Sequence, residues 1–336
     1  MTPRIRVLER IKGKPVDRIP NLNIVMMFAA RYIGVTYGKY ITDYKSLVEG
    51  NLKVCRDFGI DMVSAISDPM REAAGFGANV VIPEDNVPFS NGFLLKEYAD
   101  IKKLRVRNPL SCERMLDRIK AIELYKQEAG EEYPILGWVE GAFAEANDLR
   151  GMSELMVDMF DEPEFVKELL DICTEQAILF SREQIKAGAE FIGIGDAAAS
   201  LVGPEIYGEF ILPYEKKLID SIHSLGAYAK LHICGNITNI MKHIAKSGAD
   251  IVDIDWMVDF SKAVQAFEGS SAVCGNFDPV RVLLEGSVEE VKSEVRKCIA
   301  AADSTAFLAA GCEVPKYTPY ENLRAVAETI AEAGSR

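Results

Sequence analysis

The sequence predicts an α/β fold, a single (β/α)₈ barrel formed by one domain over residues 1–336. Eight short apolar or β-branched runs alternate with longer amphipathic stretches, and several of these stretches end in a glycine of C-cap type. Such alternation is typical of parallel strands joined by right-handed helical crossovers. Eight strands of nearly continuous apolar character favour closure into a barrel, and an open doubly wound sheet is the alternative.

The eight predicted strands can be placed from the apolar runs. They cover residues 19–27, 61–69, 133–141, 189–197, 227–235, 249–257, 271–279 and 305–315. The helical patterns between the later runs include residues 204–226, 239–248 and 288–302. Each predicted strand is therefore followed by material suited to cover the outside of a barrel.

One connection is too long for a simple crossover. Residues 72–130 follow the second predicted strand and contain "GFGANVVIPEDNVPF", which has the turn residues of a hairpin. We expect this segment to form an excursion over the mouth of the barrel.

Composition limits the classes of function. The net charge of −13 argues against a nucleic-acid surface. The N-terminus lacks the apolar stretch of a signal peptide, and no apolar run approaches the roughly 20 residues that a membrane span needs. Seven cysteines at irregular spacing favour reduced thiols over a disulfide framework. The expected location is the cytoplasm, and any special cysteine is expected to be a ligand or a nucleophile.

Polar residues gather at the predicted strand ends, where barrel enzymes keep their chemistry. These residues are Asp68, Glu140, Asp196, His232, Cys234, Asp255, Asp278 and Cys312. Within the run 227–235, the period of two directs His232 and Cys234 to the same side, into the barrel.

These side chains predict a catalytic zinc site. Cys312 lies 78 residues after Cys234, and only a closed barrel brings the fifth and eighth strands to one mouth. One imidazole and two thiolates are preferred zinc ligands, and an oxygen of Asp255 is expected to complete the shell and to yield to substrate. Cys274 is a rival ligand that precedes the polar tip of its strand. The other four cysteines are expected to be small core residues.

The ligand set also indicates what the metal does. Two thiolates and an imidazole donate much charge, so the ion is a weak source of hydroxide and a good holder of a substrate sulfur, kept as a nucleophilic thiolate. A structural zinc in a non-catalytic barrel is the alternative. Such sites usually have four closely spaced protein ligands, whereas this trio is widely separated and one ligand short.

Several stretches carry a resemblance to a known family. "LHICGNI", "GADIVDID", "CGNFDPV", "GCEVPKYTPYENLRA" and the opening "MTPRIRVLERIKGKPVDRIP" resemble the uroporphyrinogen decarboxylase superfamily along nearly the whole chain. The sequence is most similar to its zinc-dependent branch of methylcobamide:coenzyme M methyltransferases. This resemblance maps the zinc ligands onto His232, Cys234 and Cys312 and implies the same barrel fold.

The resemblance implies a methyltransferase that works with methylcobalamin carried on a corrinoid-binding partner protein and with a thiol or another small methylated compound. The direction of transfer stays open. Asp255 and Asp68 are the candidate catalytic side chains, and Glu140 and Asp196 are expected to shape the cavity that receives the cofactor. The partner is expected to dock transiently on the rim formed by residues 73–90 and 313–322.

A decarboxylase activity is the competing interpretation. The decarboxylases resemble one another in an Arg-Gln-Ala-Gly-Arg-Tyr segment whose arginines hold the porphyrinogen carboxylates. The corresponding stretch here is "MFAARY", in which Arg31 and Tyr32 remain and Met27 stands in place of the first arginine. Asp68 would match the decarboxylase aspartate. Half of the anion clamp is nevertheless missing, which disfavours an octa-carboxylate substrate.

Overall fold

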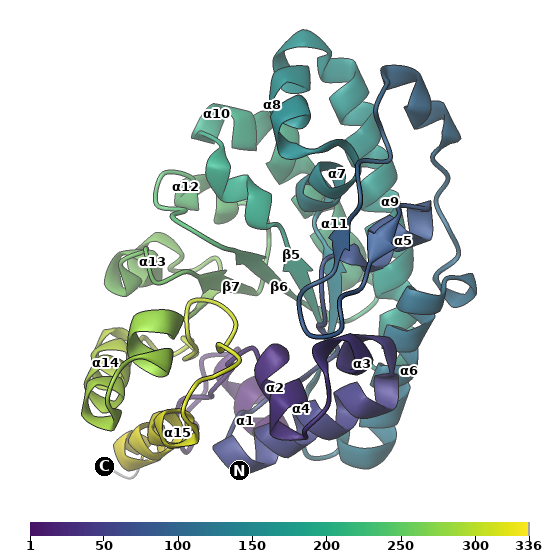
Figure 1. Ribbon diagram of the computed structural model, residues 1–336. Helices are drawn as coiled ribbons and strands as arrows, with labels where there is room; N and C mark the ends of the chain where they lie inside the picture. Colours follow the sequence, from purple (N-terminus) through teal and green to yellow (C-terminus); the bar gives the residue numbers. More distant parts are fainter. Residues whose placement is uncertain (335–336) are drawn as a thin grey trace.

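Six short parallel strands form a strongly curved sheet at the centre of the protein, as seen in the computed structural model, which describes residues 1–334 (Figure 1). The strand order is β1-β4-β5-β6-β7-β8, so neighbours along the chain are neighbours in the sheet. The strands are β1 (Val63–Ser64), β4 (Ile135–Glu140), β5 (Phe191–Gly195), β6 (Tyr228–Ile233), β7 (Ile251–Ile254) and β8 (Ala272–Cys274).

Single backbone bridges close the sheet into a barrel. Leu308 pairs with Asn21, and its neighbour Phe307 pairs with Cys274 at the end of β8. On the other side, the Asp61 N–H donates to the Asn21 carbonyl over 2.7 Å, next to β1. The first and last predicted strands therefore lie at their expected positions in the barrel, but they pair with their neighbours through isolated bridges and not through continuous ladders. Pro20, which has no N–H, limits the first ladder. The fold is a (β/α)₈ barrel, and the open sheet is excluded.

Helices surround the barrel and cover the outer face of its strands (Figure 1). The α-helices are α1 (Pro3–Arg10), α2 (Met27–Tyr32), α3 (Tyr37–Thr42), α4 (Tyr44–Phe58), α5 (Met70–Phe76), α6 (Glu113–Ala129), α7 (Ala142–Arg150), α8 (Met152–Asp161), α9 (Pro163–Ala187), α10 (Pro204–Ile206), α11 (Leu212–Ser224), α12 (Met241–Ile244), α13 (Phe260–Ala266), α14 (Val288–Ala301) and α15 (Tyr320–Gly334). The 3-10 helices are η1 (Tyr98–Lys103), η2 (Pro109–Ser111) and η3 (Ala197–Leu201), and the π-helices are η4 (Tyr207–Ile211) and η5 (Pro279–Leu284).

Local sequence signals set several helix starts. At α14, the Ser287 hydroxyl accepts from the Glu290 N–H and the Glu290 carboxylate accepts from the Ser287 N–H, which is a capping box. Helix α9 begins with Pro163, whose missing N–H is harmless in the first turn.

The segment predicted as an excursion, residues 72–130, contains helices as well as a hairpin. Helices α5 and α6 occupy the two ends, because both carry ordinary helical patterns that pack in the crossover layer. Between them lies a small antiparallel hairpin of β2 (Val80–Val81) and β3 (Phe89–Ser90). Its turn residue Asp85 accepts from the Tyr37 N–H at 3.2 Å and from Lys316 Nζ. That this segment covers the mouth stays a prediction.

The inside of the barrel has an apolar floor. A cluster separate from the main core includes Leu136, Phe191, Ile251 and Ala272, which stand at or near the starts of their strands. Val7 of α1 belongs to the same cluster and is fully buried. The starts of the strands are therefore sealed, and polar chemistry is left to their carboxyl ends.

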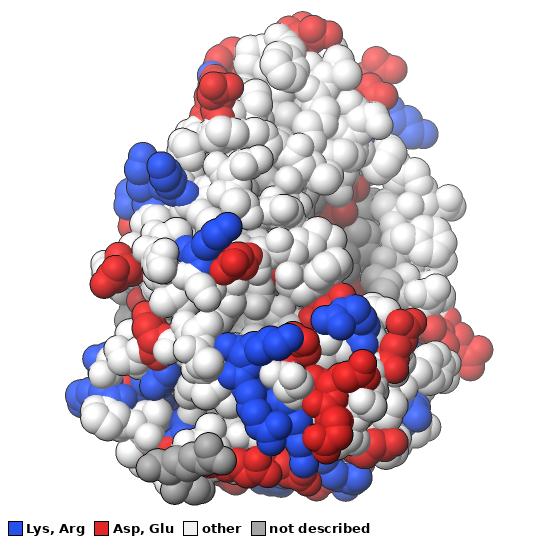
Figure 2. All heavy atoms as spheres, turned by 90° about the vertical axis from the view of Figure 1, so that its left-hand side faces the viewer, with Lys and Arg blue, Asp and Glu red and all other residues white. Residues whose placement is uncertain are grey.

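The surface carries mixed charge. Figure 2 shows one face on which Lys and Arg side chains alternate with Asp and Glu in the lower part, while the middle and upper parts are mostly uncharged. This face offers no continuous basic band of the kind that binds nucleic acid. Within residues 1–334, no helix has both the length and the apolarity required to cross a bilayer.

Candidate metal centre

Three ligand-type side chains meet at the carboxyl ends of the strands. His232 Nε2 lies 3.0 Å from Cys234 Sγ, and Cys234 Sγ lies 3.6 Å from Cys312 Sγ. Cys312 Sγ is in turn 4.0 Å from His232 Nε2. All three ligand atoms fall within 4.8 Å of one another. The fold thus brings together the predicted trio from segments 78 residues apart.

Local backbone features hold this trio in place. His232 is in β6 and Cys234 follows its end, so both project to the inside. Gly235 comes next with φ +87°, a left-handed conformation that glycine tolerates, and its N–H donates to Asp255 Oδ2 over 2.8 Å. Gly311, before Cys312, approaches the Trp256 backbone so closely that a Cβ there would lie 2.3 Å from the Trp256 nitrogen. The Cys312 segment therefore packs directly on the loop after β7.

The chemistry of the donors fits zinc. One imidazole nitrogen and two sulfurs are the borderline and soft ligands that zinc prefers, and three protein ligands with one open position is the pattern of catalytic sites. Among residues 1–334, this trio is the one group of His, Cys, Asp or Glu close enough to hold an ion. A zinc ion would be held by His232, Cys234 and Cys312.

The two thiols share one proton unequally. A hydrogen bond from the Cys234 thiol to Cys312 lowers the pKa of Cys312 to about 4, against the cost of burial. The same hydrogen bond, with burial, raises the pKa of Cys234. Burial lowers the pKa of His232, but the Cys234 sulfur and Asp253 raise it well above its usual value. The pocket thus already favours thiolate on one ligand.

A buried ion pair supports His232 from behind. His232 Nδ1 lies 3.3 Å from Asp253 Oδ2, and the same oxygen accepts from Lys230 Nζ. Burial raises the pKa of Asp253, but Lys230 and His232 outweigh it and lower that pKa to about 2. A carboxylate on the second imidazole nitrogen fixes which nitrogen faces the metal. Lys230 was not predicted as part of the site, although it is two residues before His232 and four before Cys234 and so lies on the same face of the strand.

The other candidates near the trio have different contacts. Asp255 Oδ2 accepts from the Gly235 N–H at 2.8 Å and Asp255 Oδ1 from the Met257 N–H at 3.3 Å, so its carboxylate orders the loop beside Cys234. Its role as an exchangeable ligand stays a prediction. Cys274 is buried next to Asp253 and lies outside the trio. Asp278 caps η5 through the N–H groups of Val280 and Arg281.

A small cavity of about 190 Å³ opens beside the trio. Its walls are mainly apolar, and three acidic side chains also reach it, two of which, Asp68 and Glu140, were predicted at strand ends. The lining residues are Ile24, Met26, Ile66, Asp68, Pro69, Trp138, Glu140, Gly195, Ala197, His232, Cys234, Cys312 and Glu313. Burial raises the pKa of Glu313 to about 7, and its Oε1 accepts from the Met27 N–H at 2.7 Å.

The predicted carboxylates differ in their surroundings. Asp68 accepts from the Ser67 hydroxyl and from Arg114, and these partners outweigh burial and lower its pKa. Asp196 does not line the cavity; its Oδ1 accepts from the Ala144 N–H at 2.8 Å at the start of α7, and burial raises its pKa to about 7. Asp196 therefore orders α7, and its proposed contact with a cofactor stays a prediction.

A buried acidic cluster lies behind the cavity wall. Arg71 donates to Glu140 Oε1 at 2.7 Å and to Glu72 Oε2 at 3.3 Å. Glu145 on α7 is 2 % exposed, and neither of its carboxylate oxygens has a hydrogen-bond partner among the described residues. Burial and the neighbouring carboxylates raise the pKa of Glu145 well above its usual value and that of Asp148 to about 8.

Replacing Glu145 with glutamine is expected to stabilise the protein at pH 8. Because the folded-state pKa of Glu145 is raised, the native form holds a proton that the unfolded chain releases. The stability from this group is fully present below its unfolded pKa of about 4 and falls as the pH rises above it. Glutamine removes the titrating group, and we expect a gain of about 1–3 kcal/mol at pH 8. Urea unfolding of the metal-free wild type and variant at pH 5 and pH 8 measures the difference in the free energy of unfolding. A gain at pH 5 that equals or exceeds the gain at pH 8 would contradict this prediction.

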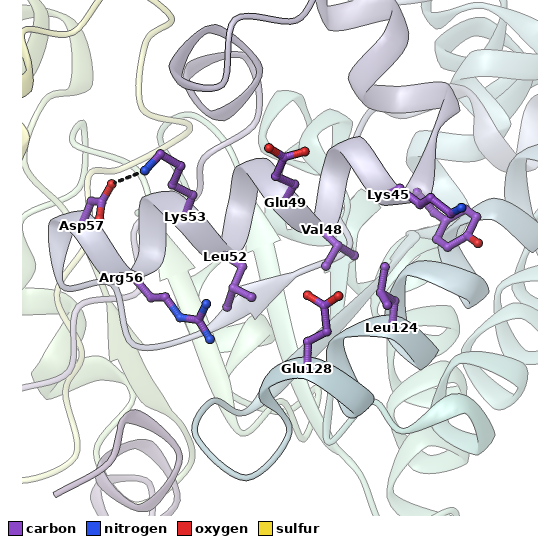
Figure 3. Close-up of a pocket in the computed structure, with 10 residues that line it drawn as sticks. Lys45, Val48, Glu49, Leu52, Lys53, Arg56, Asp57, Leu124 and Glu128 are labelled. Atoms are coloured by element: carbon purple, nitrogen blue, oxygen red, sulfur yellow. Dashed lines mark hydrogen bonds and ion pairs between the residues drawn. The ribbon is translucent and has the colours of Figure 1, made fainter.

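A larger hollow lies on the outer surface. A groove of about 670 Å³ runs between α4 and α6 on the outside of the barrel (Figure 3). Its charged groups are paired or face solvent; Lys53 Nζ, for example, lies 3.1 Å from Asp57 Oδ2. Nothing in the groove has the clustered ligands or nucleophiles of the strand-end cavity.

Known proteins with similar sequences include methylcobamide:CoM methyltransferases and uroporphyrinogen decarboxylases. Methylcobamide:CoM methyltransferase MtbA from Methanosarcina mazei is 28% identical over 334 residues, which cover 97% of each chain. Uroporphyrinogen decarboxylase from Carboxydothermus hydrogenoformans is 26% identical over 296 residues, covering 86% of this chain and 83% of that protein.

The fold has a near-complete match among solved structures. A methyltransferase from Methanosarcina mazei superposes with a TM-score of 0.91 at 23% identity and covers 99% of both chains. A B12-independent methionine synthase from Shewanella sp. W3-18-1 matches more distantly, with a TM-score of 0.61 and 13% identity. Residues 2–333 match the uroporphyrinogen decarboxylase (URO-D) family, and the chain belongs to that family.

Proposed function

We propose that the protein is a zinc-dependent, corrinoid-linked methyltransferase that moves a methyl group between a methylated corrinoid protein and a small thiol. The observation that supports this most directly is the His232, Cys234 and Cys312 trio at the wall of a small cavity. Relatives that span 97% of the chain are named methylcobamide:CoM methyltransferases, in agreement with this chemistry.

Zinc and the surrounding side chains have separate roles in the proposed reaction. When bound, zinc keeps a substrate thiol in its nucleophilic thiolate form at neutral pH. His232 is held by Asp253 so that Nε2 faces the cavity, and Lys230 keeps Asp253 ionised. The apolar side chains of Ile24, Met26, Ile66 and Trp138 exclude water from the reacting sulfur.

A corrinoid does not enter this site. A cavity of about 190 Å³ has room for a small molecule only. The cobalt-bound methyl group must therefore be presented at the mouth, and the proposed carrier is a corrinoid-binding partner protein. The proposed docking rim consists of residues 73–90 and 313–322, which the contact between Asp85 and Lys316 joins. The seven cysteines are free thiols, in keeping with a reducing cytoplasm as the place of work.

Decarboxylation of a porphyrinogen suits this site less well. Arg31 is the remaining arginine of the predicted anion clamp. Its Nη1 donates a hydrogen bond to the Lys316 carbonyl over 3.1 Å, and its guanidinium lies over the Tyr317 and Tyr320 rings. It is therefore engaged in the rim loop. Met27 offers no charge, and the acidic groups on the cavity wall repel an octa-carboxylate.

The proposed function is tested with purified protein. We expect about one zinc per chain and, with methylcobalamin and a panel of small thiols, an absorbance change that reports loss of the cobalt-bound methyl group. The metal-stripped protein is the matched control and is expected to be inactive until zinc is restored. Zinc-loaded protein that is inactive with methylcobalamin and with corrinoid proteins from its own genome neighbourhood would refute the proposal.

A further inference from the structure

We infer that the thiol accepted by this site carries no negative charge and ends in a hydrogen-bond donor, an ammonium or a hydroxyl group, which binds Glu140. This inference rests on the proposed function and specifies the substrate class of the same cavity. It follows from the charges around the cavity, from the free oxygen of Glu140 and from the space beside Gly195.

The cavity wall supplies acids and no positive partner. Asp68, Glu140 and Glu313 line it, and none of its lining residues is a lysine or an arginine among the residues that the structure describes. Sulfonate, carboxylate and phosphate groups are recognised by guanidinium, ammonium or clustered N–H groups. An anionic head in this space would be desolvated without a cation in the cavity wall to compensate its charge, which is unfavourable.

The nearest cations each contact an acid, although Arg71 Nη1 and Arg114 Nε and Nη1 have no hydrogen-bond partner among the described residues. Arg71 lies behind Glu140 and contacts both Glu140 and Glu72, so two carboxylates share one guanidinium. Arg114 is bound to Asp68. Lys230 lies deeper in the barrel and is paired with Asp253. In these pairs the acids Asp68 and Glu140 line the cavity. Their cationic partners, and Lys230, do not.

Lys316 and Arg31, on the rim, are also occupied. Lys316 is bound to Asp85, and Arg31 is held by the backbone carbonyls of Lys316 and Thr318. Neither Lys316 nor Arg31 lines the cavity.

Glu140 has one oxygen available. Its Oε1 accepts from Arg71 at 2.7 Å, whereas no donor contacts Oε2 within residues 1–334. A Cβ on Gly195 would lie 3.0 Å from that oxygen and 3.1 Å from the Trp138 indole nitrogen. Because residue 195 is glycine, the space beside Oε2 stays open to the cavity, and the head group fits there with its sulfur toward the metal ligands.

The test compares two-carbon thiols that differ only at the far end. These are 2-aminoethanethiol, 2-mercaptoethanol and 2-mercaptoethanesulfonate (coenzyme M). With zinc-loaded protein and methylcobalamin, kcat/KM is expected to be at least about tenfold higher for the amine and the alcohol than for the sulfonate. Calorimetric titration of the same thiols without a methyl donor is expected to give the same order of Kd.

A preference for the sulfonate in both measurements overturns this inference and leaves the proposed function standing. Inactivity of all three thiols, together with failure of the corrinoid proteins, overturns the proposed function itself. Equal affinities for all three thiols also contradict the inference, because a free Oε2 beside a desolvated head group must discriminate between them.

Two variants assign the preference to Glu140. Glu140→Gln is expected to lower the amine-to-sulfonate ratio of kcat/KM at least about tenfold, since the amide offers a donor and Arg71 loses one of its two acids. Glu145→Gln removes a buried carboxylate that does not line the cavity, and it is expected to leave the ratio unchanged. Equal shifts in the two variants overturn the assignment. If Glu140→Gln fails to fold, the thiol series on the unaltered protein still decides the inference.

Discussion

Replacement of Cys312 with alanine is expected to reduce bound zinc to less than about a tenth of the wild-type content and to abolish methyl transfer. A three-point site that loses one ligand has two donors left, His232 and Cys234, which are too few for a tightly held ion. Cys312 lies at a strand-end loop beside the cavity and outside the apolar core, so the barrel itself is expected to fold. Metal analysis after dialysis against zinc, with the methylcobalamin assay, measures both effects.

Cys274→Ala is the matched control, because Cys274 is a buried cysteine outside the trio. It is expected to keep its zinc. The metal-free forms of wild type and Cys312→Ala are expected to melt within a few degrees of each other, which separates loss of metal from loss of fold. If Cys312→Ala keeps the wild-type zinc content and Cys274→Ala loses it, the third zinc ligand is Cys274 and not Cys312.

Replacement of Lys230 with methionine is expected to lower the free energy of unfolding by about 3–5 kcal/mol. Lys230 and Asp253 are both buried, and the substitution leaves the Asp253 carboxylate inside the barrel with His232 as its nearest partner. An uncompensated buried charge is costly, whereas the pair itself contributes little net stability. Urea unfolding of the zinc-saturated protein measures the change.

The double variant Lys230→Met, Asp253→Asn is the control for this prediction. Removing both charges together avoids the stranded carboxylate, so we expect the double variant to regain more than half of the lost stability. Zinc affinity is expected to stay below wild type, because asparagine supports His232 less strongly than a carboxylate does. A double variant as unstable as Lys230→Met would mean that lysine acts through packing instead of charge.

The sequence predicted the barrel because apolar runs and helical patterns are local features. Six runs became strands, whereas residues 19–27 and 305–315 are held by isolated bridges, which periodicity alone does not distinguish from a ladder. The excursion over residues 72–130 stays a prediction, because periodicity along the chain does not say where the helices at 70–76 and 113–129 and the hairpin between them lie relative to the mouth.

The site was predicted as far as residue type and strand position allow. His232, Cys234 and Cys312 came together because closure of the barrel follows from the strand count. Lys230 and Glu313 were missed, since a lysine in a strand and a glutamate beside a ligand carry no distinctive spacing. The buried acids around Arg71 depend on how α5 packs against α7, which is a tertiary contact that no local pattern encodes.

Residues 305–315, which carry Cys312, pair with their neighbours through isolated bridges, and this affects how long the site retains its ion. Cys312 follows a stretch joined to its neighbours at Leu308, Phe307 and Ala310 by single bridges, while His232 lies in a continuous ladder. A segment held by isolated bridges is expected to open at a lower free energy than a continuous ladder. Metal escape is therefore expected to begin with local opening of the Cys312 loop, so the lifetime of the bound ion is set by that local step and not by unfolding of the whole protein.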